Sequence, residues 1–175
     1  MNQSVFVTRT FGVLLLVLSL TGCAGYRVGN ISGRDIQGVR SIYVPVARNS
    51  SLEPDIQVTV TNAIVRRFNN DGTLEVNQTS NADSELDVTI TDVHRTATRS
   101  STSDVLVTAQ YQLTIQAKVT FTNRRLGRKI FENTLVSGST TFFTQANIQE
   151  GERQALPLAA EDLATNAVKL VTEGW

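Results

Sequence analysis

Basic side chains concentrate in one short stretch, Arg124-Arg125-Leu126-Gly127-Arg128-Lys129, which holds four cations in six residues. Guanidinium and ammonium groups bind phosphate or carboxylate by charge-assisted hydrogen bonds, and arginine does so bidentately. Arg95 and Arg99, near the end of another predicted strand, are further candidates for the same patch. The stretch is therefore a candidate anion-binding site. The alternative is a solvated turn whose charges protect the edge of a sheet.

Residues suited to catalysis are scarce in this sequence. His94 is the only histidine, and Asp92 precedes it by two residues, on the same face of a predicted strand. Such a pair can hydrogen-bond, but solvated pairs of this kind are common. One histidine and one cysteine do not make a zinc site, and phosphate-binding glycine loops and serine nucleophile elbows are missing. The residues favour a binding protein without metal or cofactor over an enzyme.

The N-terminal stretch has the layout of a secretory signal peptide. Arg9 precedes an apolar run of ten residues, 11–20, which is shorter than the about 20 residues that span a bilayer as a helix. Leu20-Thr21-Gly22-Cys23 then resembles the lipobox of bacterial lipoproteins, in which the cysteine is acylated and becomes the first mature residue. The alternative is an ordinary cleaved signal, which would leave the only cysteine as a thiol without a disulfide partner. By the same resemblance, Ala24 fits release to the outer membrane.

These features predict three segments: a signal peptide (1–22), a lipidated N-terminus and tether (23–40) and a single α+β domain (41–175). Removal of the signal leaves 175 − 22 = 153 residues, which suffice for one core without disulfides. Lys plus Arg and Asp plus Glu both number 16, so the chain as a whole attracts neither nucleic acid nor an anionic membrane. Any charged site must be local.

Alternating apolar residues predict several strands. The longest alternation covers residues 110–122, with apolar side chains at Tyr111, Leu113, Ile115, Ala117, Val119 and Phe121. A strand of this kind has one buried and one solvated face. Further strands are predicted at 41–46, 74–76, 86–98 and 129–136, the last in a hairpin with 110–122. Residues 138–151 show no period and are predicted to be irregular.

Residues 56–68 fit two patterns, because their first apolar residues alternate as in a strand while the whole set forms a helical stripe. The stripe consists of Ile56, Val60, Ala63, Ile64 and Phe68. A helix is the preferred interpretation, with Asp71-Gly72 as its stop. A second stripe covers 156–171, with Pro157 at a first turn or a kink. The prediction is an α+β two-layer sandwich, with two helices on one face of a mixed, mainly antiparallel sheet of about four strands.

The order of short motifs along the chain resembles the lipopolysaccharide-assembly lipoprotein (LptE) family. The matching pieces are Gly25-Tyr26 after the lipobox, Ile42-Tyr43-Val44-Pro45, Asn49 leading through Pro54 to the helix at 56–68, Ala82-Asp83 before Leu86-Asp87-Val88-Thr89-Ile90, Gly127 in a hairpin, Glu152-Arg153-Gln154-Ala155, Asp162-Leu163-Ala164 and Trp175. These pieces are individually short, and they span nearly all of the mature chain.

The resemblance implies an outer-membrane lipoprotein that sits inside a large β-barrel translocon (LptD-like), plugs it, assists its assembly and binds lipopolysaccharide. Polar surfaces would then face the barrel lumen, and basic residues would meet the phosphates of lipid A. No motif aligns such residues here, so Arg124, Arg125, Arg128 and Lys129 are nominated from charge alone. The alternative is a periplasmic lipoprotein that activates a peptidoglycan synthase; such proteins usually carry a longer tether.

Overall fold

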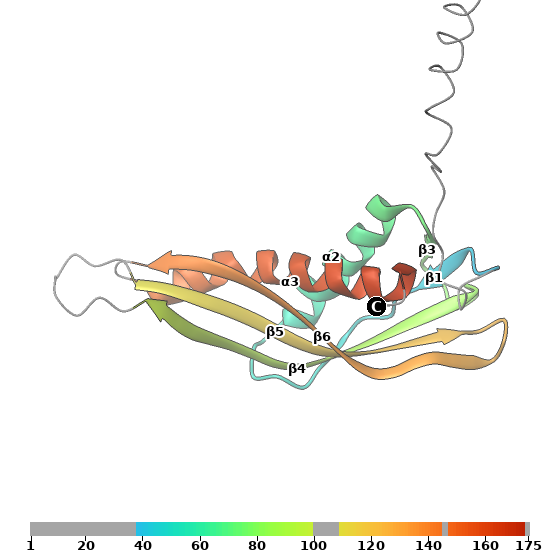
Figure 1. The fold of residues 1–175 in the computed structure, drawn as a ribbon, viewed down its shortest axis with the longest axis horizontal. Helices are drawn as coiled ribbons and strands as arrows, with labels where there is room; N and C mark the ends of the chain where they lie inside the picture. The colour runs from blue at the N-terminus through green and yellow to red at the C-terminus, as the bar shows by residue number, and fades with distance from the viewer. Residues whose placement is uncertain (1–37, 100–108, 145–146, 174–175) are drawn as a thin grey trace, which may run out of the picture. The chain divides into compact units, whose positions relative to one another are not determined.

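The computed structural model describes residues 38–99, 109–144 and 147–173, without the side chains of Arg99, Ala109 and Thr144. The expected signal peptide, Cys23 and most of the tether lie outside the described residues. The elements in chain order are β1 (Ser41–Tyr43), β2 (Arg48–Asn49), α2 (Ile56–Asp71), β3 (Glu75–Asn77), β4 (Ser84–Arg99), β5 (Ala109–Asn123), β6 (Arg128–Thr144) and α3 (Ile148–Glu173). The described helices α2 and α3 lie over one sheet (Figure 1), which makes an α+β fold.

The described sheet has six strands in the order β3-β1-β4-β5-β6, with β2 also paired to β4. The long strands β4, β5 and β6 pair antiparallel. The short strands β1, β2 and β3 make parallel pairs, so three of the five pairings are parallel. The prediction of a mainly antiparallel sheet of about four strands is therefore corrected. β2, with two residues, is the strand that the sequence pattern did not predict, because so short a strand shows no period.

Both helices pack on the same face of the sheet and bury the core beneath them (Figure 1). α3 lies on β5 and β6, and α2 packs against α3 and the short strands. The largest fully buried side chains include Phe68 from α2, Phe121 from β5 and Leu163 from α3. Neither helix of the described chain combines the length and apolarity needed to cross a membrane.

The helix predicted at 56–68 is confirmed. α2 ends at Asp71, and Gly72 takes the left-handed conformation (φ 71°) while its N–H donates to the Phe68 carbonyl at 3.0 Å. A non-glycine residue would be strained there.

The second helix is longer than predicted, because α3 begins at Ile148 and holds Pro157 well inside it. Its first two turns are mostly polar and show no apolar stripe. Their start is set by Asn147, whose side-chain oxygen accepts hydrogen bonds from the N–H groups of Gln149 and Glu150 at 3.1 and 3.3 Å. Asparagine is a strong N-cap residue, so Asn147 marks the start of α3 in the sequence as well as in the structure.

The prediction of irregular structure from residue 138 is wrong for 138–144, because β6 continues to Thr144. Gly138 and Thr140 occupy positions opposite the buried Ile115 and Leu113 of β5. The expected alternation is hidden because two positions on the helix-facing side are not apolar. A Cβ atom on Gly138 would lie 2.0 Å from the backbone nitrogen of Leu163 in α3. Glycine is required there so that the helix can approach the sheet.

A register shift in β4 between Ile90 and Asp92 explains why the alternation fades after residue 90. Beyond this bulge the faces are exchanged. Asp92 and His94 lie opposite Gln116 and Thr114, on the sheet face away from the helices. Arg95 lies opposite the buried Leu113 and therefore turns toward the helix layer.

Candidate functional site

The strand register places the β5–β6 turn beside the start of β4 and next to β1. Asn123 pairs with Ser84, which in turn pairs with Ile42. Ser84 and Asn123 are almost completely buried, and the Asn123 side chain accepts a hydrogen bond from the Leu126 N–H at 3.1 Å. The turn is therefore held by its own first residue. Arg40, Asp83 and residues 124–129 meet here and are called the hairpin end below.

Asp83 connects three segments of the hairpin end. One of its carboxylate oxygens accepts hydrogen bonds from the N–H groups of Arg40 at 2.9 Å and Ser41 at 3.3 Å. Its backbone carbonyl accepts from the N–H groups of Arg124 and Arg125 at 2.9 and 3.4 Å. Asp83 thus ties the start of β1 to the β5–β6 turn.

The same contacts change the acidity of Asp83. The Arg40 N–H donor holds the pKa of the Asp83 carboxyl below its ordinary value of 3.8, with smaller contributions from Ser41 and the charge of Arg125, against the desolvation that raises it. Hydrogen bonds to the charged form of a carboxyl group favour that form. The carboxylate is therefore kept ionised as part of the fold.

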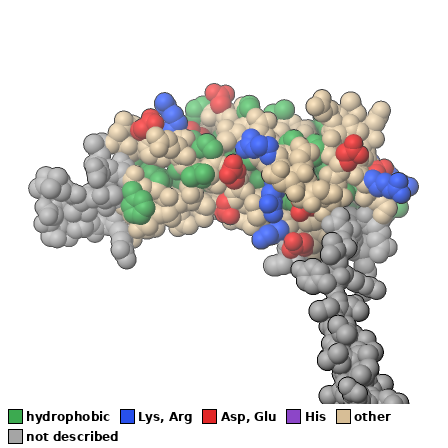
Figure 2. All heavy atoms as spheres, turned by 90° about the horizontal axis from the view of Figure 1, so that it is seen from above, with side chains coloured by type: hydrophobic (Ala, Val, Ile, Leu, Met, Phe, Trp, Pro, Cys, Tyr) green, Lys and Arg blue, Asp and Glu red, His purple; other side chains and the backbone are tan. Residues whose placement is uncertain are grey.

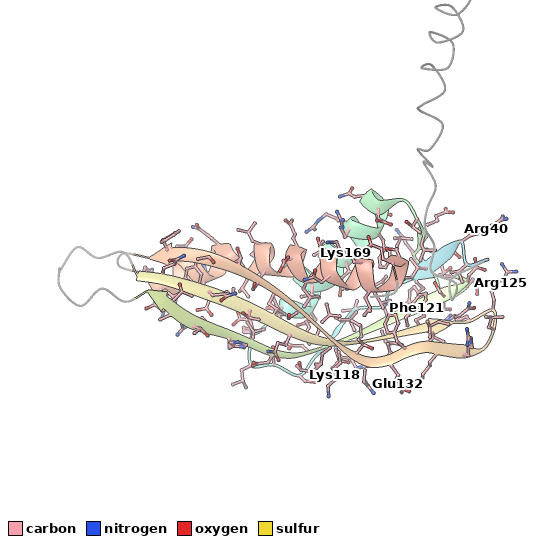
Figure 3. All side chains as sticks on the ribbon, viewed as in Figure 1. Arg40, Lys118, Phe121, Arg125, Glu132 and Lys169 are labelled. Carbon is pink, nitrogen blue, oxygen red and sulfur yellow. The ribbon has the colours of Figure 1, made fainter. Side chains whose placement is uncertain are left out.

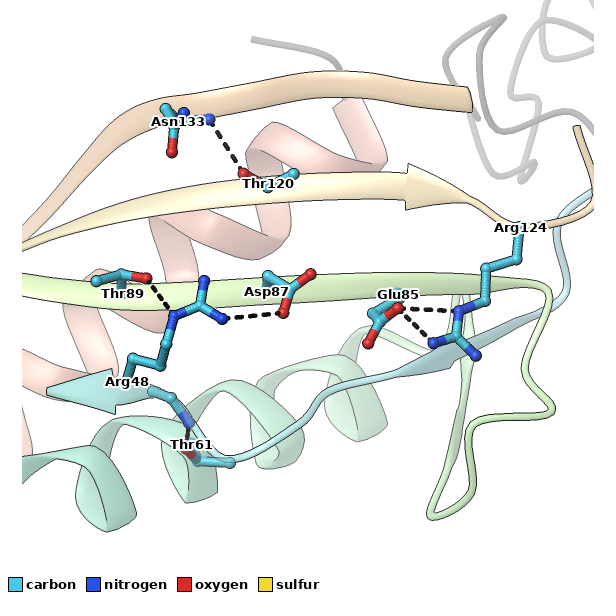
Figure 4. Close-up of polar contacts among 9 residues, drawn as sticks. Arg48, Thr61, Glu85, Asp87, Thr89, Thr120, Arg124 and Asn133 are labelled. Carbon is cyan, nitrogen blue, oxygen red and sulfur yellow. Dashed lines mark hydrogen bonds and ion pairs between the residues drawn. The ribbon is translucent and has the colours of Figure 1, made fainter. Parts of the chain in front are cut away.

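Arg124 is committed to the fold rather than to solvent. Its guanidinium donates from Nε to Glu85 at 2.9 Å and from a terminal nitrogen to the same carboxylate oxygen (Figure 4). It also donates to the Ser80 carbonyl and lies over the Tyr43 ring, 5.9 Å from the centroid. Of the four hairpin cations, it is the half-buried one.

The other three hairpin cations are exposed. Arg125 donates to the Gly38 carbonyl at 2.7 Å and lies 3.9 Å from Asp83. Lys129 pairs with Glu132, and both of their side chains are 53% exposed. Exposed ion pairs of this kind hold their partners weakly, so Arg125 and Lys129 can exchange their carboxylates for another anion.

Arg40 is a member of this group that the sequence did not reveal. Its side chain is exposed, and its backbone is bound to Asp83, the same residue that pairs with Arg125. Figure 3 shows Arg40 and Arg125 at the same end of the domain, and Figure 2 shows Lys and Arg side chains gathered there with carboxylates beside them. Only the parallel pairing of β1 with β4 brings Arg40 close. In the sequence, the Ala82-Asp83 motif before β4 is the feature that could have indicated the contact between Arg40 and Asp83.

The structure does not bring Arg95 and Arg99 into the hairpin end. Ser84, not Arg95, is the β4 residue that faces the turn, and Arg95 lies eleven positions further along the strand, since 95 − 84 = 11. At about 3.3 Å per residue this is roughly 36 Å. Arg95 instead pairs with Glu152 of α3 at 2.5 Å, and the Arg99 backbone pairs with Gln110. The expectation of one shared patch is therefore wrong.

The remaining sequence candidates give no second site. Nδ1 of His94 is hydrogen-bonded to the Asp92 carboxylate at 2.8 Å, with the carboxylate oxygen as the acceptor, and both side chains are about half exposed, at 42 and 54%. No group of three or more metal-binding side chains occurs among the described residues. Cys23, the predicted lipidation site, lies outside them.

Comparison with solved structures finds similar folds. A minor lipoprotein from Acinetobacter baumannii has a TM-score of 0.51 at 11% identity, over 78% of this chain and 94% of that one. A neuraminyllactose-binding hemagglutinin homolog from Helicobacter pylori has a TM-score of 0.50 at 8% identity, over 78% and 88%. At these identities the likeness concerns the fold alone.

Comparison with curated protein sequences gives no match. A family model described as lipopolysaccharide-assembly (LptE), in contrast, matches residues 39–169. The match runs from two residues before β1 almost to the end of α3 and covers most of the chain. The chain belongs to the LptE family of lipopolysaccharide-assembly proteins.

Proposed function

We propose that this protein is an outer-membrane lipoprotein, anchored through acyl chains on Cys23, that plugs and helps to assemble a β-barrel translocon for lipopolysaccharide. The observation that carries the proposal is the family match over residues 39–169. The lipobox-like residues 20–23 supply the anchor, and stable anchoring requires more than one acyl chain. The role is one of assembly and binding, without catalysis.

The sheet face opposite the helices supports a polar partner surface. On β5 its side chains are Gln112, Thr114, Gln116, Lys118, Thr120 and Thr122. Glu85, Asp87 and Asp92 of β4 lie on the same face. Neither lipid tails nor an apolar protein surface would satisfy its hydrogen-bonding and charged groups. The lumen of a large outer-membrane barrel is polar and hydrated. We propose that this face lies against the lumen wall.

Binding of lipopolysaccharide is proposed at the hairpin end. Arg125, Arg128 and Lys129 are exposed there, and phosphate accepts charge-assisted hydrogen bonds from such groups. Arg124 would hold the turn through Glu85 rather than contact the lipid. Arg95 and Arg99, at the opposite end of β4, are proposed as a separate and secondary contact.

Two experiments test this function. Affinity purification from detergent-solubilised envelopes should recover a large β-barrel; recovery of a peptidoglycan synthase instead would replace the proposal with the alternative role.

Reversal of Arg125, Arg128 and Lys129 to Glu should weaken lipopolysaccharide binding about ten- to hundredfold, at roughly 0.5–1 kcal/mol for each exposed cation. Lys118→Glu, on the polar sheet face, is the matched control. Equal binding by both variants, with intact circular dichroism, would rule out the hairpin end as the lipid site.

A further inference from the structure

The hairpin end is also the place where the described chain begins. The carbonyl of Gly38, the first described residue, accepts a hydrogen bond from Arg125 at 2.7 Å. Two residues later, Arg40 is bound through its N–H to Asp83 at 2.9 Å. The root of the tether is therefore fixed to the β5–β6 turn rather than to the helices or to the middle of the sheet.

An apolar side chain marks the apex of this turn. Leu126 is 62% exposed, and the exposed Arg125, Arg128 and Arg40 surround the same end. Five cations (Arg40, Arg124, Arg125, Arg128 and Lys129) lie here near four carboxylates (Asp83, Glu85, Glu132 and Glu75, whose N–H donates to the Arg40 carbonyl at 2.9 Å), which leaves a net charge of 5 − 4 = +1. An apolar tip within a cationic ring matches the boundary of a membrane, with headgroup phosphates outside and acyl chains below.

The length of the tether lets this tip reach the membrane. Cys23 and Gly38 are 38 − 23 = 15 residues apart, which at about 3.3 Å per residue allows roughly 50 Å of separation. A covalent anchor makes surface contact an intramolecular event at high effective concentration. A few cations and one leucine, too weak to bind a membrane from solution, then suffice to orient the domain.

We propose that the β5–β6 turn docks on the anionic phospholipid surface of the membrane that holds the anchor, with Leu126 at the headgroup boundary and Arg40, Arg125 and Arg128 on phosphates. This inference rests on the proposed lipid attachment at Cys23. The proposed partner of the hairpin end is phospholipid, so the vesicles used in the test contain no lipopolysaccharide. The docked domain would hold the hairpin end, where the tether begins, at the membrane, and not the opposite end of β4.

The three lysines of the chain provide the assay without any substitution. Lys129 lies at the hairpin end, Lys118 on the polar sheet face and Lys169 on α3, and all three are exposed; Figure 3 labels the latter two. The lipidated protein is placed in vesicles of phosphatidylcholine with or without phosphatidylglycerol, lipids that have no primary amine. Acylation of the lysines by an amine-reactive reagent is then read by mass spectrometry.

Docking is expected to slow modification of Lys129 severalfold in the anionic vesicles only, while Lys118 and Lys169 react equally in both. Arg40→Glu and Arg125→Glu should restore the rate, since each cation at an anionic surface changes the docked ratio about fivefold. High salt should act in the same direction. Leu126→Asp is a second variant that removes the apolar contact at an exposed turn position.

A Lys129 rate that is the same in both kinds of vesicle, in a chain whose mass shows acylated Cys23, would overturn the docking alone. A mass that shows an unmodified Cys23 would overturn the anchor and the docking together. Loss of lipopolysaccharide binding or of the barrel partner is measured separately and does not alter the lysine rates. The failure of each proposal is therefore distinguishable.

Discussion

The substitution Gly138→Ala tests how closely α3 is seated on the sheet. Gly138 lies opposite Ile115 in the β5–β6 ladder. A Cβ atom there would be 2.0 Å from the Leu163 nitrogen and 2.4 Å from the Ala159 carbonyl oxygen. Both are backbone atoms of a helix, so no side-chain rotation can relieve the contact. The whole of α3 must move instead.

The required movement follows from these distances. Ordinary contact begins at 3.4 Å, so the two shortfalls are 3.4 − 2.0 = 1.4 Å and 3.4 − 2.4 = 1.0 Å. A gap of 0.5–1 Å already forfeits about a quarter to a half of the dispersion energy along the separated surface. We therefore expect a cost of about 3 kcal/mol, the upper part of the range for overpacked cores. Total stabilities of about 5–15 kcal/mol leave little reserve for such a loss.

Urea unfolding followed by circular dichroism measures this cost. With a slope of about 2 kcal/mol/M, the midpoint should fall by about 1.5 M. Gly127→Ala is the matched control, because an added Cβ meets nothing within 4 Å and only the positive φ of 63° is strained, at about 1 kcal/mol. Its midpoint should fall by about 0.5 M. Equal midpoints for the two variants would refute the close-approach argument.

The other predictions concern charged residues. Asp83→Asn should cost about 1–2 kcal/mol of stability near neutral pH. Because the pKa of Asp83 in the folded state is lowered from 3.8, the stability that its carboxylate adds should be complete above pH 3.8 and should vanish as the pH falls through the folded-state pKa. Urea titrations at several pH values measure this difference. Arg95→Gln and Glu152→Gln should show a coupling of about 0.5–1 kcal/mol in a double-mutant cycle, since Arg95 is 45% exposed. Arg124→Gln should lower stability by about 1–2 kcal/mol by leaving Glu85 without its partner, and should leave lipopolysaccharide binding unchanged.

Each of these predictions has a specific contrary result. A pH profile of Asp83→Asn parallel to that of the unsubstituted chain would show that the carboxylate contributes nothing to folding. Additive effects at Arg95 and Glu152 would remove the link between β4 and α3. A selective loss of lipid binding by Arg124→Gln, at full stability, would make Arg124 a lipid contact and not a structural residue.

The fold was predictable where one interaction dominates the sequence pattern. β5 is buried on one face along its whole length, so burial alone sets its alternation, and its predicted span was nearly exact. The predicted end of β6 came too early, because Gly138 is required by the backbone of α3 at Leu163, which is 163 − 138 = 25 residues away in the sequence. Short strands such as β2 depend on pairing with β4 rather than on their own residues.

The sequence predicted that the candidate site is basic, but it did not predict which basic residues outside the hairpin turn belong to it. The four hairpin cations are adjacent in sequence, so their proximity needed no structure. Arg40 lies near these cations because β1 pairs with β4, and Arg95 lies far from them because it is at the other end of the long strand β4. Neither distance follows from residue spacing. The internal partner of Arg124, Glu85, also required the register of β4 with β5.

The edge of β6 decides which surfaces remain for a partner. Among the described strands, β6 has a neighbour on one side only, and a long open edge invites pairing with another chain. α3 closes its middle, because Asp162 accepts a hydrogen bond from the Ser139 N–H at 2.8 Å and Asn166 donates to the Ser137 carbonyl at 2.9 Å. An added strand would have to displace both helix side chains. A partner therefore meets the described domain more readily on the polar sheet face or at the hairpin end.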